Sequence, residues 1–272
     1  MNRSPLMVRI LSGGAFALIA LALMYAGSVG TYVLAAGLAA LALWEFRGLS
    51  GQMGYLAPTW LLYPLGVYFT FSGTLLKNID LKLVLSLALV GGLMAFLFIP
   101  GRREGLGRWA MGMAGALYVG LPFNFYLVLY QSSAKHGLAW LVFTVGAAVL
   151  SDVAALLVGS RLGRHAFFSR ISPKKTVEGA VAGVVAAVLT ILFGSAVALS
   201  LPWPHAVALG ILIGLSAELG DLVESQMKRI AEVKDSSHLI PGHGGVLDRL
   251  DSALFPPILV YYYALLTGLL FR

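Results

Sequence analysis

The residue types that could do chemistry gather in one stretch near the C-terminus, from Ser225 to Asp251. This stretch separates two apolar segments and mixes acids, bases, histidines and a glycine-rich turn. Ionisable groups beside a bilayer are costly, and they usually line a site or an ion path. We therefore interpret the stretch as part of an active site. Its ionisable residues are Lys228, Arg229, Glu232, Lys234, Asp235, His238, His243, Asp248, Arg249 and Asp251.

A polar stripe leads into this stretch along the apolar segment that precedes it. Glu218, Asp221, Ser225, Lys228 and Glu232 follow spacings of three, four, three and four residues. In an α-helix these spacings place the side chains on one face. A solvated helix face explains Lys228 and Glu232 equally well. Glu218 and Asp221 directly follow an apolar run, so we predict that these two acids belong to the site.

A glycine-rich turn follows the stripe. The segment Pro241 to Gly245 predicts a turn, because proline lacks an N–H group and glycine adopts backbone shapes that other residues avoid. The N–H groups of Gly244 and Gly245 are candidates for contact with phosphate oxygens. His243 is a candidate to position a phosphate, and a metal ligand or a base are the alternatives.

Two further acids come just beyond the turn. Asp248 and Asp251 stand three residues apart at the start of a predicted helix, which places them on one face, with Arg249 turned away. A simple helix-dipole role explains acids in a first turn as well. Together with Asp221, however, they supply the carboxylate oxygens that Mg²⁺ uses when it also holds the phosphates of a nucleotide.

A lysine pair lies some fifty residues before the turn. Ser172 is a suitable N-cap and Pro173 a suitable first helical residue, so Lys174 and Lys175 are predicted in the first turn of a helix. A helix N-terminus that carries two lysines is suited to binding phosphate. A topology signal in contact with lipid headgroups is the alternative. Glu178, one turn further on, is a candidate partner for either lysine.

Asp152 lies inside another apolar segment, where an ionisable group must face a partner, water or a site. A structural hydrogen bond is the alternative to a functional role. Asp152, Glu218 and Asp221 together also suit a second class of protein, an ion-coupled membrane transporter with acids in the membrane. These acids cluster toward one end of their segments, which favours access from one side and therefore favours an enzyme.

The composition explains where these groups must sit. Of 272 residues, 59% are hydrophobic and only 11% are charged, against roughly 25% charged in a soluble domain. Apolar blocks of about 20 residues indicate membrane-spanning helices rather than strands of a β-barrel. The chain has no cysteine, which excludes disulfides, thiolate nucleophiles and cysteine-bound metals. Its net charge of +7 fits basic membrane loops, and we expect no nucleic-acid partner.

The sequence therefore predicts an all-α fold, a polytopic integral membrane helical bundle with about nine transmembrane helices. With the N-terminus in the cytoplasm, fifteen of the 19 Lys and Arg residues fall on the cytoplasmic side, as the positive-inside rule expects. This predicts a multi-pass protein of a bacterial-type inner (plasma) membrane whose polar site faces the cytoplasm. The predicted spans are 6–26, 28–46, 56–76, 81–100, 109–130, 137–160, 176–200, 205–230 and 253–271.

The chain divides by content into two halves. Residues 1–136 form helices rich in Gly and Ala, for which we predict packing, dimer contacts and lipid access. Residues 137–272 carry the acids and the lysine pair, and we predict that they form the catalytic half.

The polar stretch and two shorter motifs resemble the phosphatidate cytidylyltransferase, or CDP-diacylglycerol synthase, family. The shorter motifs are SPKKTVEG at 172–179 and GDLVES at 220–225, and the resemblance covers about the C-terminal 45% of the chain. The segment from Asp152 to Leu156 departs from the family's usual Asp-Thr-Gly-Ala-Tyr, and Glu218 stands where an amide is common. The residues that match the family signature are Ser225, Lys228, Arg229, Lys234, Asp235, Pro241, His243, Gly244, Gly245, Asp248, Arg249 and Asp251.

The resemblance implies a membrane enzyme that joins CTP to phosphatidic acid and releases CDP-diacylglycerol and pyrophosphate. It implies Mg²⁺ and, in some members, a monovalent cation such as K⁺, and it implies a homodimer in the lipid bilayer. Metal ligation is expected at Asp221, Asp248 and Asp251. Substrate binding is expected at Asp152, Ser172, Ser225, His243, Gly244 and Gly245, and catalysis at Lys174, Lys175, Asp221, Lys228, Arg229, Asp248 and Arg249.

The expected mechanism is an attack by the lipid phosphate on the α-phosphorus of CTP. No general base is needed, because a phosphate monoester with a second pKa of about 6 is mostly a dianion near pH 7. Positioning and neutralisation of charge then supply most of the catalysis. Other lipid-phosphate enzymes, such as a CDP-alcohol transferase or a polyprenol kinase, share the use of acids and a metal but do not require this signature.

Overall fold

The computed structural model of the protein describes residues 5–97, 102–133, 136–240, 242 and 244–271. Within these ranges the chain is helical and contains no β-strand, which confirms the all-α prediction. The longer helices are α1 (Pro5–Tyr25), α2 (Ser28–Gln52), α3 (Thr59–Phe71), α4 (Leu81–Phe96), α5 (Arg102–Gln131), α6 (Gly137–Leu162), α7 (Val177–Gly194), α8 (Trp203–Ile230) and α10 (Pro256–Leu266). The short elements are a π-helical turn η1 (Ser195–Leu199), α9 (Leu247–Leu250) and two 3₁₀ turns, η2 (Asp251–Ala253) and η3 (Leu269–Phe271).

The chain folds into two compact units, each of which is made of two separate stretches of the sequence. The first unit comprises Met1–Leu127 and Lys228–Arg249, and the second comprises Val128–Met227 and Leu250–Arg272. Most of the signature stretch therefore groups with the N-terminal helices. The predicted division of labour between residues 1–136 and 137–272 concerns function, and it stays a prediction.

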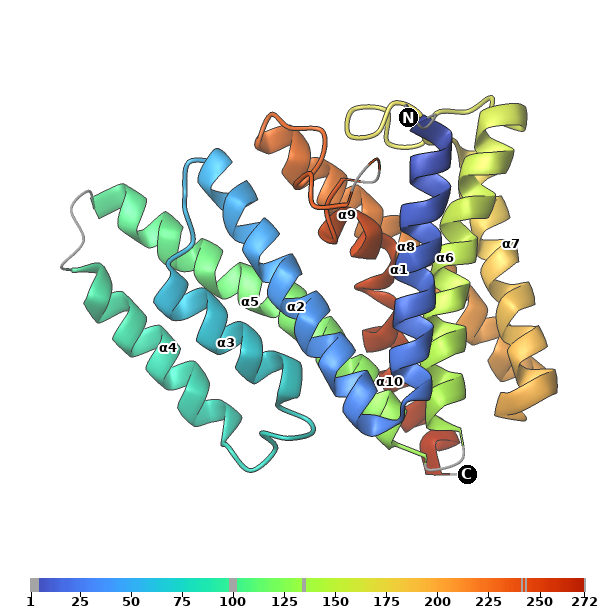
Figure 1. Ribbon diagram of the computed structural model, residues 1–272, viewed down its shortest axis with the longest axis horizontal. Coiled ribbons are helices and arrows are strands. Elements are labelled where there is room, and N and C mark those ends of the chain that lie inside the picture. The colour runs from blue at the N-terminus through green and yellow to red at the C-terminus, as the bar shows by residue number, and fades with distance from the viewer. Residues whose placement is uncertain (1–4, 98–101, 134–135, 241, 243, 272) are drawn as a thin grey trace. The chain divides into compact units, whose positions relative to one another are not determined.

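The first unit is built on α2, α3, α4 and most of α5. Helix α3 contacts both α2 and α4 (Figure 1). Its core contains Leu43, Leu49, Leu62 and Phe69, each at most 2% exposed. The indole nitrogen of Trp109 on α5 donates a hydrogen bond to a carbonyl of α4 at 3.1 Å. Apolar packing and such interhelical bonds hold these helices together.

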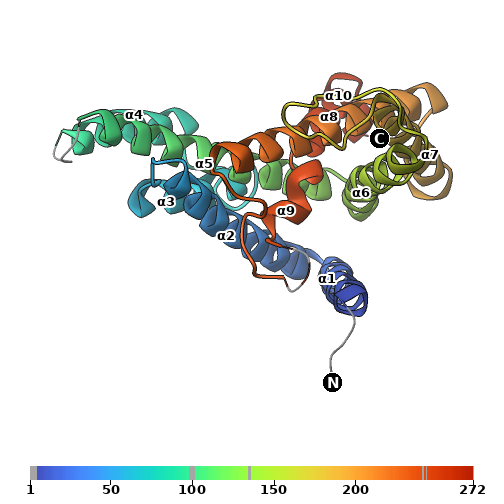
Figure 2. The same cartoon turned by 90° about the horizontal axis from the view of Figure 1, so that it is seen from above.

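The second unit is built around α6 and α7, which run side by side in both views (Figures 1 and 2). The buried face of α7 is made of small or β-branched residues, which allow close helix packing. The opposite face is apolar and exposed: Val181, Val185, Leu189 and Phe193 recur every four residues and are 51–62% exposed. Small residues inside and large apolar residues outside are the pattern of a helix that faces lipid.

Five helices of the described chain are long and apolar enough to cross a membrane: α2, most of α5, α6, α7 with η1, and α8. The protein is therefore a multi-pass membrane protein. Each of the nine predicted ranges contains a helix, but the count of nine spans is not confirmed. Helices α3, α4 and α10 have 13, 16 and 11 residues, whereas a span needs about 20.

Candidate functional site

The second unit brings the lysine pair to the acids of α8. The ammonium of Lys175 lies 2.5 Å from Glu218 Oε2 and 2.8 Å from Asp221 Oδ2. Burial alone lowers the pKa of Lys175, but the charges of Asp221 and Glu218 outweigh burial and raise the pKa above its usual value. Lys175 is therefore a cation that holds two carboxylates together. The sequence predicted each of these residues in the site but not their contact.

Lys175 lies in a loop that precedes α7, and here the predicted helix start is wrong. Thr176, not Ser172, is the N-cap, and its side chain accepts a hydrogen bond from Gly179 N–H. The preceding residues pair instead as a small hairpin, in which Phe167 N–H donates to the Lys175 carbonyl at 2.9 Å. Ser172 and Thr176 are both suitable caps, and this hairpin pairing decides between them.

Glu178 closes this loop from the first turn of α7. Its Oε2 accepts the N–H groups of Arg164 and His165 at 3.1 and 3.3 Å, and its Oε1 lies 2.6 Å from Nδ1 of His165. The expected pairing of Glu178 with Lys174 or Lys175 is therefore wrong, because the hairpin places His165 next to the Glu178 carboxylate. Glu178 fixes the base of the loop that presents the lysines.

A cavity of about 410 Å³ opens beside this cluster within the second unit. This volume lies within the range of roughly 300–1,000 Å³ that is usual for small-molecule sites. Ala155 and Leu156 of α6 and Ala180 of α7 form an apolar part of the wall, so the cavity combines an apolar side with a charged side. Its polar and charged lining includes Asp152, Ser172, Lys174, Lys175, Glu218 and Asp221.

The polar stripe of α8 is confirmed for its first four members. The helix runs unbroken through Glu218, Asp221, Ser225 and Lys228, and Ser225 Oγ donates to Asp221 Oδ1 at 3.2 Å. The helix ends at Ile230, so Glu232 lies beyond it with a positive φ of 56°. Glu224 on the same helix is fully buried, and the sequence did not predict it as part of the site.

Asp251 begins the 3₁₀ turn η2, because α9 ends at Leu250. The continuous helix on which Asp248 and Asp251 were predicted to share a face is therefore not formed. Within the second unit, the backbone of Asp251 lies against α8 at Gly220. A Cβ atom on Gly220 would collide with the Asp251 carbonyl oxygen, so glycine permits this close approach next to Asp221.

The first unit holds a second acid–lysine pair. Lys228 Nζ donates to Asp248 Oδ1 at 2.6 Å. Asp248 Oδ2 accepts three hydrogen bonds, each at 2.8 Å, from the Ser236 N–H, the Ser236 hydroxyl and the Gly245 N–H. Burial raises the pKa of Asp248, but the bonds from Lys228 and Gly245 outweigh it and hold the pKa below its usual value. Arg229 and Arg249 are exposed.

The glycine-rich turn has the predicted backbone. Gly242 and Gly244 have φ of 77° and 80°, a region that favours glycine, and Ile240 N–H donates to the Gly244 carbonyl at 2.8 Å. A Cβ atom on Gly245 would collide with Ser236 Oγ. Pro241 and His243 lie outside the described residues.

One acid of the first unit was missed entirely. Glu45 on α2 is 1% exposed, and its carboxylate accepts hydrogen bonds from the signature stretch. The sequence predicted packing, dimer contacts and lipid access for residues 1–136, and the only signal for Glu45 was that it is a lone glutamate in an apolar segment.

The described residues contain no group of three or more acids or histidines that could hold a metal ion by themselves. Mg²⁺ at a nucleotide site, however, commonly uses one or two carboxylates and completes its coordination with phosphates and water. Glu218 and Asp221 already converge on one cation, the Lys175 ammonium. This pair of acids therefore fits a divalent cation that arrives with a phosphate-bearing substrate.

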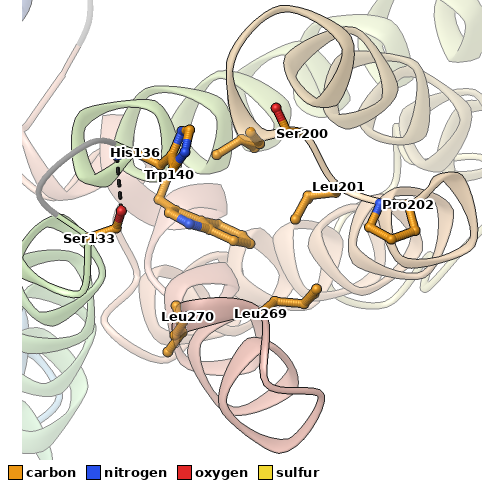
Figure 3. A pocket seen from close by; sticks show the side chains of 9 residues that line it. Ser133, His136, Trp140, Ser200, Leu201, Pro202, Leu269 and Leu270 are labelled. Carbon is orange, nitrogen blue, oxygen red and sulfur yellow. Dashed lines mark hydrogen bonds between the residues drawn. The ribbon is translucent and has the colours of Figure 1, made fainter. Parts of the chain in front are cut away.

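A second cavity, of about 230 Å³, lies at the other end of α6 (Figure 3). Its wall combines Trp140 with Leu269 and Leu270 on one side and the segment Ser200–Pro202 on another. Ser133 Oγ accepts the His136 N–H at 3.1 Å at its edge. The described residues that line it include no acid or lysine, and its volume is smaller than that of most ligand sites. The acid–lysine cavity is therefore the better candidate.

Comparison with known proteins decides the family. A model of the cytidylyltransferase family matches residues 7–267, nearly the whole chain. The chain belongs to this family. The match confirms the resemblance drawn from the signature stretch and gives no support to the ion-coupled transporter. The match also extends over the N-terminal helices, which contain none of the motifs that indicated the family.

Several relatives are named phosphatidate cytidylyltransferase. The protein of Staphylococcus saprophyticus is 32% identical over 189 residues, which cover 68% of this chain and 69% of the relative. The Bacillus subtilis protein is 36% identical over 148 residues, covering 54% and 55%, and the Synechocystis protein is 51% identical over 120 residues, covering 43% and 40%. The matched part thus spans only about half of the last two relatives.

Proposed function

We propose that the protein transfers the cytidylyl group of CTP to phosphatidic acid, forming CDP-diacylglycerol and pyrophosphate. The observation that carries the proposal is the Lys175–Glu218–Asp221 cluster, which lines a half-apolar cavity in a multi-pass member of the cytidylyltransferase family. A phospholipid with an anionic head needs both kinds of wall. The names of the relatives agree with this chemistry.

The residues of this chain would act mainly by positioning and by neutralising charge. Lys175, with the exposed Lys174 beside it, would bind phosphate oxygens at the cavity. Ser172 and Asp152, which line the same cavity, and Ser225, which is bonded to Asp221, would orient the substrates and the acids. The lipid phosphate needs no general base, because near pH 7 it is already mostly a dianion with a second pKa of about 6.

The signature residues of the first unit would serve the same reaction. We propose that Lys228, Arg229 and Arg249 share the negative charge of the nucleotide phosphates, and that His243, Gly244 and Gly245 contact them. Arginine and lysine near a transferred phosphoryl group stabilise the charge that develops in the transition state.

We propose Mg²⁺ as the cofactor, with Asp221, Asp248 and Asp251 as the acids that would hold it. The pair of Asp221 and Glu218, which already share one cation, supports this proposal. When bound, Mg²⁺ supplies neutralisation of the phosphate charge and of the departing pyrophosphate. Lys175 would then exchange its carboxylate partners for substrate phosphate. A monovalent cation such as K⁺ as a second cofactor, a homodimer in the bilayer and a site that faces the cytoplasm belong to the same proposal.

The test is to incubate the purified protein with labelled CTP, phosphatidic acid and Mg²⁺. We expect a CDP-lipid and pyrophosphate in equal amounts, and we expect neither product when a chelator replaces Mg²⁺. Absence of both products, in protein shown to be folded by a cooperative melting transition, would falsify the proposal. Size measurement of the detergent-solubilised protein by light scattering tests the homodimer separately.

A further inference from the structure

Glu45 is a deeply buried acid that the proposed mechanism does not use. It lies on α2, far from the signature stretch in sequence, and its residue is 1% exposed. Burying a carboxylate is unfavourable unless hydrogen bonds replace the lost water. The hydrogen-bond partners of Glu45 therefore indicate its role.

Both carboxylate oxygens of Glu45 are engaged by the signature stretch. Oε1 accepts the Ser237 hydroxyl at 2.6 Å and the Val246 N–H at 2.8 Å. Oε2 accepts the Leu247 N–H at 2.6 Å and lies 3.2 Å from the Ser236 hydroxyl. One side chain thus joins the two ends of the segment that contains the glycine-rich turn.

The same contacts lead directly to Asp248. The Ser236 hydroxyl has a single proton and lies closer to Asp248 Oδ2, at 2.8 Å, than to Glu45 Oε2, at 3.2 Å, so it donates to Asp248. Leu247, whose N–H Glu45 holds, is the residue before Asp248. A Cβ atom on Gly245 would come too close to Glu45 Oε1, so glycine is required for this approach.

We propose that Glu45 is a positioning residue for the signature stretch: it anchors Ser237, Val246 and Leu247 and thereby sets the placement of the Asp248 carboxylate. This inference rests on the proposed function, because it gives Glu45 its effect through a signature acid. It makes an N-terminal helix part of the catalytic apparatus. Residues that orient a metal-binding or phosphate-binding group typically contribute a factor of roughly 10–100 to activity.

Glu45→Gln tests this with little change in volume. The glutamine can still accept from Ser237 and Val246, but its NH₂ group faces the Leu247 N–H, and two donors cannot bond. We expect kcat for CDP-lipid formation to fall roughly 10- to 100-fold, with a smaller change in KM for CTP. We also expect faster amide hydrogen exchange at Val246 and Leu247.

Leu49→Ala is the matched control. Leu49 lies one turn further along α2 and is fully buried, but it makes no hydrogen bond to the signature stretch. This variant should lower the melting temperature while it leaves kcat and the exchange at Val246 and Leu247 near wild type. Equal losses in Leu49→Ala and Glu45→Gln would overturn the proposal, since both would then report only damage to α2.

Ser237→Ala keeps the test decisive if Glu45→Gln fails to fold. It removes the hydroxyl that donates to Glu45 and leaves the glutamate in place. We therefore expect a smaller fall in kcat and a smaller rise in exchange at Val246 and Leu247. Unchanged exchange and kcat in either variant contradict the proposal. If the wild-type protein forms no CDP-lipid, the proposed function fails, whereas exchange at Val246 and Leu247 still decides whether Glu45 anchors the segment.

Discussion

The two acid–lysine pairs look alike in sequence but differ in how their carboxylates are held. Asp221 in the second unit is 20% exposed, lines a cavity, and is bonded to Lys175 and Ser225. Asp248 in the first unit is 3% exposed and accepts four hydrogen bonds, three of them on one oxygen. A carboxylate with free coordination sites is available to a ligand, and one that is saturated mainly organises its loop. We infer that Asp221 acts chiefly on substrate and metal, and that Asp248 acts as well on the fold of the signature stretch.

Asp221→Asn should have the largest effect on activity. An amide cannot replace the charge that balances a cation, and loss of several kcal/mol of transition-state stabilisation reduces turnover roughly 10³-fold. Because Asp221 is partly exposed, we expect the melting temperature to stay near wild type. Turnover close to wild type would contradict the assignment of this acid.

Asp248→Asn should separate the two acids. The amide oxygen can take the place of only one carboxylate oxygen, and the NH₂ group then faces either Lys228 or the Ser236 and Gly245 donors, with which it cannot bond. We therefore expect lower turnover together with a loss of about 1–3 kcal/mol in stability. Hydrogen exchange across residues 236–247 reports the loosening. If Asp248→Asn leaves stability and exchange unchanged, as expected for Asp221→Asn, the distinction between the two pairs is wrong.

Lys175→Met tests the cluster from the cationic side. The substitution keeps much of the side-chain length and leaves Glu218 and Asp221 without their shared cation, so we expect a loss of activity of about 100-fold. Lys174→Met is the matched control, because Lys174 is exposed and forms no ion pair with a carboxylate in the described chain. For this variant we expect at most about a tenfold loss. Steady-state rates at saturating CTP compare the two, and equal losses would indicate a general effect of charge.

Much of this arrangement could be predicted from local patterns. The stripe from Glu218 to Lys228 followed from helical periodicity, because α8 runs straight through it. The turn at Gly242 and Gly244 followed from the chemistry of glycine. Such features depend on neighbours within a few residues, so the sequence carries them directly.

The parts that failed depend on contacts between distant residues. Ser172 and Thr176 are equally good caps, and only the hairpin that pairs Phe167 with Lys175 selects Thr176. The contact between Lys175 and Glu218 joins residues 43 apart. Glu45 reaches Leu247 across 202 residues, and no local pattern distinguishes it from an acid that is solvated at a helix end.

Gly220→Ala should have the smallest effect and sharpen the account of the second unit. The added methyl group would collide with the Asp251 carbonyl oxygen, and overpacking of this kind costs about 1–3 kcal/mol. Gly146→Ala on α6 is the control, because a Cβ atom there meets open space. Thermal unfolding in detergent compares them, and an unchanged melting temperature in Gly220→Ala would contradict the close approach of η2 to α8.

The most direct test of the central claim follows the label of CTP into lipid. The purified protein is given phosphatidic acid and Mg²⁺ with CTP labelled either at the α-phosphorus or at the γ-phosphorus. Cytidylyl transfer predicts that the α-label enters the lipid and that the γ-label leaves as pyrophosphate. Lipid that carries the γ-label would identify a lipid kinase and contradict the account.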